Sequence, residues 1–197
     1  MNTVIDTLIY DRTQEDVDKV FALKHKILTK GLTALSVEEK DEYMAGMKGA
    51  YNYTDMNRVG QAVSYIATRM THLPEELSLY MTNKGVADDT IYHVPYNPSS
   101  IQVSPKTDWR MEDVPTQSQT YTFLNNIVIL RKQVTLPNNA PDVPSSLDYF
   151  TFKLANDIEY LLYLIDSALT KIEKDLYSKI NHASVSFAYT GILNCGE

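Results

Sequence analysis

Cysteine and closely spaced histidines are scarce in this chain, and their scarcity excludes several kinds of site. The 197 residues include one cysteine, Cys195, so the sequence offers no internal disulfide and no cysteine-based zinc site. The four histidines lie far apart, and none stands four residues from another as a helical zinc motif requires. A glycine-rich phosphate loop and a Gly-x-Ser-x-Gly nucleophile motif are also missing. We therefore predict no catalytic residues, no cofactor and no metal.

Clustered basic charge and long apolar runs are missing as well. The chain has 18 Lys and Arg against 25 Asp and Glu, and its basic residues are scattered. Because binding to phosphates depends on clustered cations, this pattern argues against a nucleic-acid partner. No run of about 18 apolar residues is present, and the opening MNTVIDTLIYDRT has no basic segment before an apolar one. We expect a soluble protein without membrane insertion and without a signal peptide.

Helical periodicity is what the sequence does contain. A hydrophobic content of 44% with 22% charged residues is ordinary for a folded protein. We predict a mainly α fold, a helical bundle of about six helices in two halves, with a short extended arm or β-strands at the termini and in the central linker. The predicted regions are an extended arm over 1–10, an amino-terminal helical region over 11–85, a Pro-rich linker or loop over 86–115, a carboxy-terminal helical region over 116–175, and a terminal strand or tail over 176–197.

Capping residues, prolines and apolar spacing give the expected element boundaries. Thr13 with Asp16, and Ser36 with Glu39, form capping boxes that open two of the helices. Pro74 fits the first turn of a separate short helix. The expected helices cover about 13–30, 37–47, 53–70, 74–83, 116–136 and 146–174. Extended or β-like segments are expected at 3–10, 90–94, 101–103 and 183–193.

The last predicted helix carries a sustained apolar seam. Its apolar residues alternate steps of three and four, and further leucines widen the stripe. Such a broad seam is typical of a bundle core or an oligomer axis. Its members are Ala155, Ile158, Leu162, Ile165, Leu169 and Ile172.

One spacing occurs three times: an aromatic residue, an asparagine four positions later, and an aliphatic residue two positions after that. In a helix the asparagine and the aliphatic residue point about 200° apart, at roughly 100° per residue. We therefore expect the aliphatic residue in the core and the amide at its flank, bonded to the backbone of a neighbouring helix or loop. The alternative is that the asparagines lie at solvated first-turn positions. The three sets are Tyr53, Asn57 and Val59; Tyr121, Asn125 and Ile127; Phe152, Asn156 and Ile158.

Fourteen tyrosines against five phenylalanines also distinguish the chain. Phenol rings give a large contact area with one polar end, which suits contacts with proteins or sugars. Tyr51, Tyr92 and Tyr96 fall in expected loops. Ordinary half-buried packing explains them equally well.

Several segments resemble phage and prophage structural proteins of Gram-positive bacteria, found among tail and baseplate components. The similarity rests on DRTQEDVDKV, on EYMAGMKGAYNYTDMNRVGQAVSYIA, on TDWRMEDVPTQSQ, on SLDYFTFKLANDIEYLL and on the closing YTGILNCGE. It spans most of the chain and brings no catalytic residues. The resemblance implies a non-enzymatic virion protein of the tail, assembled in the host bacterial cytoplasm, whose partners are copies of itself and other tail or baseplate proteins.

Two other classes of function stay open at this point. One is a host-surface adhesin of the same particle, in which the tyrosines of the loop between Val86 and Pro115 bind a glycan. The other is a small enzyme or regulator from a mobile element. A saccharide-binding measurement and a panel of hydrolase substrates separate these classes from the structural one.

Overall fold

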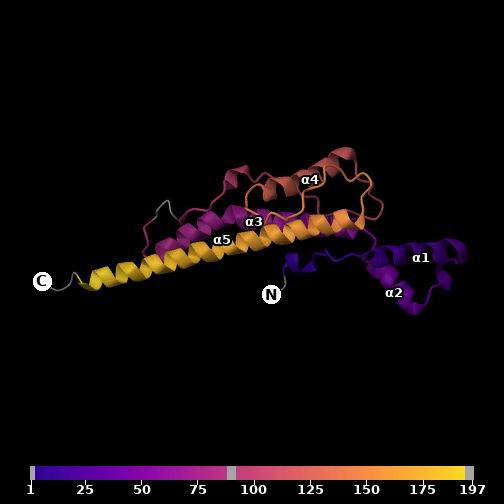
Figure 1. The fold of residues 1–197 in the computed structure, drawn as a ribbon, viewed down its shortest axis with the longest axis horizontal. Coiled ribbons are helices and arrows are strands. Elements are labelled where there is room, and N and C mark those ends of the chain that lie inside the picture. The colour runs from indigo at the N-terminus through magenta and orange to yellow at the C-terminus, as the bar shows by residue number, and fades with distance from the viewer. Residues whose placement is uncertain (1–2, 88–91, 194–197) are drawn as a thin grey trace.

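The computed structural model describes residues 3–87 and 92–193, and for 185–193 it describes the backbone alone. Within these residues the fold is mainly α, a helical bundle without strands, which confirms the predicted class (Figure 1). Short 3-10 helices lie at Val4–Thr7 (η1), Leu32–Ala34 (η2) and Pro98–Ser100 (η4). The five α-helices are α1 (Gln14–Lys30), α2 (Val37–Ala45), α3 (Tyr53–Asn83), α4 (Gln117–Arg131) and α5 (Phe152–Leu193).

The three core helices α3, α4 and α5 run in the same direction. Arg58 near the start of α3 pairs with Glu159 near the start of α5, and Tyr80 near the end of α3 donates to Asn181 far along α5. Gly60 and Phe123 line one pocket, so the first half of α4 lies beside the first half of α3. Because the helices are parallel, the segments 84–116 and 132–151 must return the chain along the bundle each time (Figure 1).

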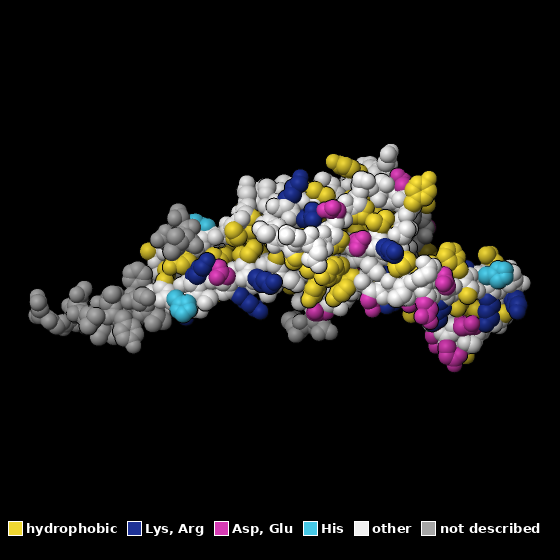
Figure 2. Space-filling model, in the orientation of Figure 1, with side chains coloured by type: hydrophobic (Ala, Val, Ile, Leu, Met, Phe, Trp, Pro, Cys, Tyr) yellow, Lys and Arg dark blue, Asp and Glu magenta, His cyan; other side chains and the backbone are white. Residues whose placement is uncertain are grey.

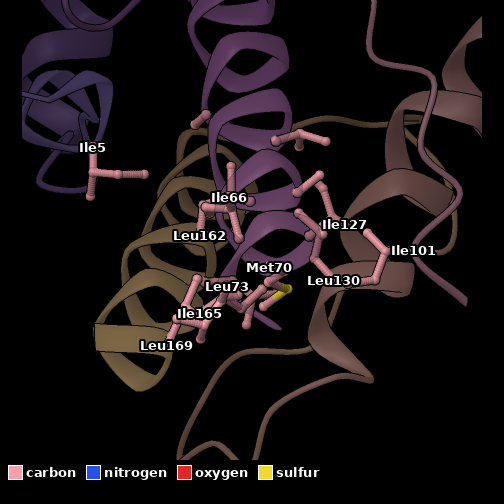
Figure 3. Packing of buried hydrophobic residues seen from close by; sticks show 14 of the residues in the cluster. Ile5, Ile66, Met70, Leu73, Ile101, Ile127, Leu130, Leu162, Ile165 and Leu169 are labelled. Atoms are coloured by element: carbon pink, nitrogen blue, oxygen red, sulfur yellow. The ribbon is translucent and has the colours of Figure 1, made fainter. Parts of the chain in front are cut away.

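One core contains apolar residues from both predicted halves of the chain. Ile66 faces Leu162, and Met70 and Leu73 lie against the α5 seam, while Ile127 and Leu130 pack on the other side of α3 (Figure 3). The seam residues are buried, except for the half-buried Ile172, and all the buried ones apart from Ala155 belong to this core. The stripe that suggested either a bundle core or an oligomer axis is therefore covered by helices of its own chain.

Helices α1 and α2 form a separate hairpin beside the amino ends of α3 and α5 (Figure 1). Four residues make its small core: Val20, Leu23, Leu35 and Met47. At its base, Gly49 lies against the first turn of α1, where an added Cβ would stand 2.1 Å from the carbonyl oxygen of Asp16. The absence of a side chain at this position is what lets the two segments touch.

We expect this hairpin to loosen in acid before the bundle does. The hydrogen bond from Lys26, followed by that from the Ser36 backbone, lowers the pKa of Glu39, and the Thr13 backbone N–H lowers the pKa of Asp16. A carboxylate whose pKa is lower in the folded state stabilises that state above its unfolded pKa, and the contribution is lost as pH falls. Amide hydrogen exchange at pH 7 and near pH 3 should show faster exchange in α1 and α2 than in α3 at the lower pH. Equal acceleration in both would contradict the assignment.

The predicted strand or hairpin over 183–193 is wrong. Helix α5 continues through these positions to Leu193, and it extends beyond the end of α3 (Figure 1). Leu176 and Ile180 continue the buried face of the seam, so the helical pattern does not stop at Lys174. The change to small and β-branched residues did not end the helix. Cys195 lies outside the described residues.

The other predicted extended segments also lack strands where they are described. At the amino terminus, Thr3 and Asp6 cap η1, and Ile5 and Leu8 enter the core of the same chain. Residues 101–103 have no regular secondary structure, and 90–91 lie outside the described residues.

The prediction of about six helices is also too high, because 53–70 and 74–83 are one helix. Pro74 lies inside α3, where it removes one backbone hydrogen bond, yet Leu73 and Leu77 keep the buried face continuous across it. Helix α4 ends earlier than expected, at Arg131, and α5 begins later, at Phe152.

Candidate functional site: a buried charge junction

A cluster of four charged side chains joins the amino-terminal segment to α3 and α5. Arg12 precedes α1, Asp55 and Arg58 lie in the first two turns of α3, and Glu159 lies in the third turn of α5. Arg12 is 3% exposed, Asp55 is 5% exposed and Glu159 is completely buried. Charged groups are rarely buried to this extent unless they are paired, so the cluster is the most unusual feature of the interior.

Arg12 is the centre of the junction. Its Nη2 lies 2.8 Å from Asp55 Oδ1 and 2.7 Å from Glu159 Oε1, and its Nε donates to the carbonyl oxygen of Lys48 at 3.1 Å. Its Nη1 donates to the carbonyl oxygen of Ile9. One guanidinium therefore connects the extended segment, the base of the hairpin and both long helices.

Arg58 completes the pairing from α3. Its Nε and Nη2 donate to the two oxygens of Glu159 at 2.8 and 2.9 Å, and Nη2 also contacts Asp55. Burial alone would lower the pKa of Arg58, but the hydrogen bonds and charges of Glu159 and Asp55 outweigh it and raise that pKa. Two cations and two carboxylates give the cluster no net charge, which makes its burial tolerable.

Two of the three asparagines of the repeated spacing each hold a backbone segment with two hydrogen bonds, close to this junction. Asn156 accepts from the backbone N–H of Arg12 at 3.1 Å and donates to the carbonyl oxygen of the same residue at 2.9 Å. Asn57 does the same with Trp109, at 2.7 and 2.9 Å. Each amide replaces the two bonds that a neighbouring strand would make, and so fixes where an irregular segment crosses a helix.

The third asparagine of the pattern, Asn125, is not the one that holds a loop. In α4 the neighbouring Asn126 accepts from the backbone N–H of Ser104 at 2.9 Å. Tyr53 and Phe152 are the first residues of α3 and α5, whereas α4 begins four residues before Tyr121. The same spacing is therefore placed one helical turn later in α4, and a different amide faces the return segment.

We expect Asn126→Ala to lower the free energy of unfolding by about 1 to 3 kcal/mol, because Asn126 is buried and its amide oxygen is the acceptor of the Ser104 backbone N–H. Asn125→Ala, at the half-buried neighbouring position, is the matched control and should change it by less than about 0.5 kcal/mol. Asn156→Ala should behave like Asn126→Ala. Urea unfolding followed by circular dichroism makes the comparison, and equal losses at 125 and 126 would contradict the assignment.

The remaining residues of the predicted set fall into two groups. Tyr53 and Tyr121 are 40% and 69% exposed, and Phe152 is half-buried, so the aromatic position is not part of the core. The aliphatic positions are buried in it, as are three seam residues. These are Val59, Ile127, Ile158, Leu162, Ile165 and Leu169.

The charged groups of the junction are paired with one another. Each carboxylate is already paired with two guanidinium groups, and at least one member of each pair is almost completely buried. Among the described residues, no group of three His, Cys, Asp or Glu side chains is arranged to hold a metal ion. The described helices also include none that is long and apolar enough to span a membrane.

Sequence reasoning missed the junction itself. Arg12 and Glu159 are 147 positions apart, and nothing in the sequence pairs them. One signal was available: Glu159 lies four residues after Ala155 and three before Leu162, so it is a carboxylate on the apolar face of α5.

Comparison of the chain with protein-family models, curated proteins and solved structures finds no match.

Proposed function

We propose that the chain is a non-enzymatic virion structural protein, a connector in the distal tail, baseplate or fibre-attachment region of a phage or phage-tail-like particle. Its partners in this proposal are copies of itself and other tail or baseplate proteins, with assembly in the host bacterial cytoplasm. The sequence resemblance supports the class of particle. The observation that carries the role of connector is the apolar surface of the α1–α2 hairpin.

Large apolar side chains are concentrated on the outside of that hairpin. Phe21 and Leu28 are seven residues apart on α1, and Val37 and Met44 are seven apart on α2, so each pair shares a helix face. All four are more than half exposed. Figure 2 shows hydrophobic side chains open to solvent beside charged ones at this end of the molecule. Apolar surface with a charged rim is typical of a protein contact.

The shape of the molecule supports the same role. The hairpin lies at one end of the bundle, and α5 extends past α3 at the other (Figure 1). Because the seam of α5 is buried in its own chain, the surfaces available for contacts with neighbouring subunits are the hairpin and the outer faces of the bundle. A subunit of this shape can touch separate neighbours at its two ends.

Electron microscopy of particles that carry a labelled copy of this protein tests the proposal. Label at the distal tail is the expected result, and particles without label would overturn the assignment.

We expect Leu28→Lys with Met44→Lys to weaken self-association without unfolding the chain, because both side chains are already in solvent. Leu79→Lys, at a position on α3 that is 63% exposed and outside the hairpin, is the control and should have no effect. Light scattering over a series of concentrations makes the measurement. A wild-type chain that remains monomeric at the highest concentration would contradict contacts between copies.

The glycan-binding alternative remains a prediction. The rings of Tyr92 and Tyr96 pack against the core, and the Tyr96 hydroxyl donates to the carbonyl oxygen of Met70 at 3.1 Å. These contacts leave less aromatic surface for a sugar, and we do not propose this function. The enzyme or regulator alternative also remains a prediction, without an observation in its favour.

A further inference from the structure

Three tyrosines, which we call the tyrosine cluster, lie together on the surface beside the charge junction. Tyr10 belongs to the segment between η1 and α1, and Tyr160 and Tyr163 are one turn apart on α5. The ring centre of Tyr10 lies 5.5 Å from that of Tyr160 and 5.4 Å from that of Tyr163. The two rings on α5 are stacked, with their centres 6.2 Å apart. Tyr10 and Tyr163 are each 39% exposed, so solvent reaches both rings of this pair.

The electrostatic surroundings of the cluster differ from those of three other tyrosines. A guanidinium or ammonium group lies over the rings of Tyr51, Tyr65 and Tyr80, in each case 5.5 Å from the ring centre. Among the described residues, no cation lies over a ring of the tyrosine cluster, and its hydroxyl groups have no hydrogen-bond partner. Because a nearby cation makes it harder to remove an electron from a ring, the cluster is easier to oxidise than those three tyrosines.

We propose that the tyrosine cluster is a site of oxidative cross-linking, in which Tyr10 and Tyr163 become joined through the ring carbons next to their hydroxyl groups. The oxidant is a peroxide acting through a haem peroxidase. Each phenol gives up one electron and one proton, and the two phenoxyl radicals combine to form the carbon–carbon bond. The hydrogen on each bonded ring carbon then moves to the oxygen of that ring, which restores the phenol. The product has lost two hydrogen atoms, and hydrogen peroxide is reduced to two molecules of water.

The geometry favours this pair over the others in the cluster. Tyr10 and Tyr163 have the shortest separation of the three pairs, and both are exposed, whereas Tyr160 is half-buried. Tyr160 and Tyr163 are held apart by their positions on one helix. The inference goes beyond the virion role and does not depend on it.

The bond attaches the amino-terminal segment to α5 next to the junction. Tyr10 is two residues before Arg12, and Tyr160 directly follows Glu159, so the cluster adjoins two of the four junction residues. The bonded positions are 153 residues apart, and closing so long a loop removes conformational freedom from the unfolded chain. We therefore expect the cross-linked chain to unfold at a higher urea concentration than the untreated chain, as a native disulfide would cause.

Treatment of the intact chain with hydrogen peroxide and a haem peroxidase tests the proposal. We expect the blue fluorescence of dityrosine and a monomeric product whose mass is lower by two hydrogen atoms. Proteolysis and mass spectrometry should then find one peptide pair that joins residues 10 and 163. The fraction of this product should be the same at two protein concentrations, because the bond is intramolecular.

Three variants complete the experiment. Tyr10→Phe and Tyr163→Phe each keep a ring in place but remove the phenol that forms the radical, so each should abolish the peptide pair. Tyr149→Phe is the control, because Tyr149 is 97% exposed and lies outside the cluster, and it should leave the yield unchanged.

Three results would each overturn the proposal. One is a wild-type chain that gives no monomeric product lighter by two hydrogen atoms. Another is a cross-linked peptide pair that lacks Tyr10 or Tyr163. The third is a Tyr10→Phe chain that gives as much monomeric product as the wild type. The peptide mapping of the wild-type chain stands even if a variant does not fold.

Discussion

Glu159→Ala should lower the free energy of unfolding by about 3 to 5 kcal/mol, the largest loss we expect from any single side chain here. The substitution leaves the buried guanidinium of Arg12 with Asp55 as its one carboxylate partner in the junction, and it removes both acceptors of the bonds that Arg58 donates to Glu159. It also removes the acceptor of the Ile9 backbone N–H, which lies 2.7 Å from Oε2. The penalty comes from the charges left behind more than from the bonds lost.

Asp175→Ala is the matched control for this prediction. Asp175 is a carboxylate on the same helix, 2.7 Å from Lys179, but both side chains are more than half exposed. Exposed pairs of this kind contribute about 0 to 1 kcal/mol. Urea unfolding followed by Trp109 fluorescence and by circular dichroism measures both variants. A loss at Glu159 no larger than the loss at Asp175 would show that the junction is not a stabilising element.

Leu162→Ala should lower the free energy of unfolding by about 2 to 5 kcal/mol, because it opens a cavity in a close-packed core. Leu162 is fully buried, and it faces Ile66 of α3 in the same chain (Figure 3). The loss should be independent of protein concentration, because every contact that it removes is intramolecular. Thermal unfolding at several protein concentrations makes this measurement.

The exposed Leu79 on α3 supplies the control, since Leu79→Ala removes the same atoms from a solvated position. It should change stability by less than about 0.5 kcal/mol. If the midpoint of the Leu162 variant rises with concentration while that of the wild type does not, the seam takes part in contacts between subunits. That result would reverse the assignment of the seam to the core.

The sequence predicted the helices and the buried seam, but it did not predict the features that depend on pairs of residues far apart in the chain. Thr13 and Ser36 mark their helices through local capping bonds, which a sequence states directly. The continuation of α3 through Pro74 and of α5 past Lys174 was missed, because tertiary burial of one face outweighed local signals.

The candidate site shows the same division. The spacing of Asn57 and Asn156 could be found in the sequence, but the residues that they hold, Trp109 and Arg12, could not. At Asn125 the spacing misled, because its position relative to the helix start differs in α4.

The parallel course of α3, α4 and α5 determines the order in which the chain can fold. The hairpin closes through near neighbours, such as Lys26 and Glu39, 13 positions apart, whereas the junction waits for residues 147 positions apart. Successive core helices cannot dock as simple hairpins. The chain must therefore close a long loop before each pair of parallel helices can make contact. Folding should therefore be slower than in an up-and-down bundle of equal size, with Arg12 and Glu159 meeting late.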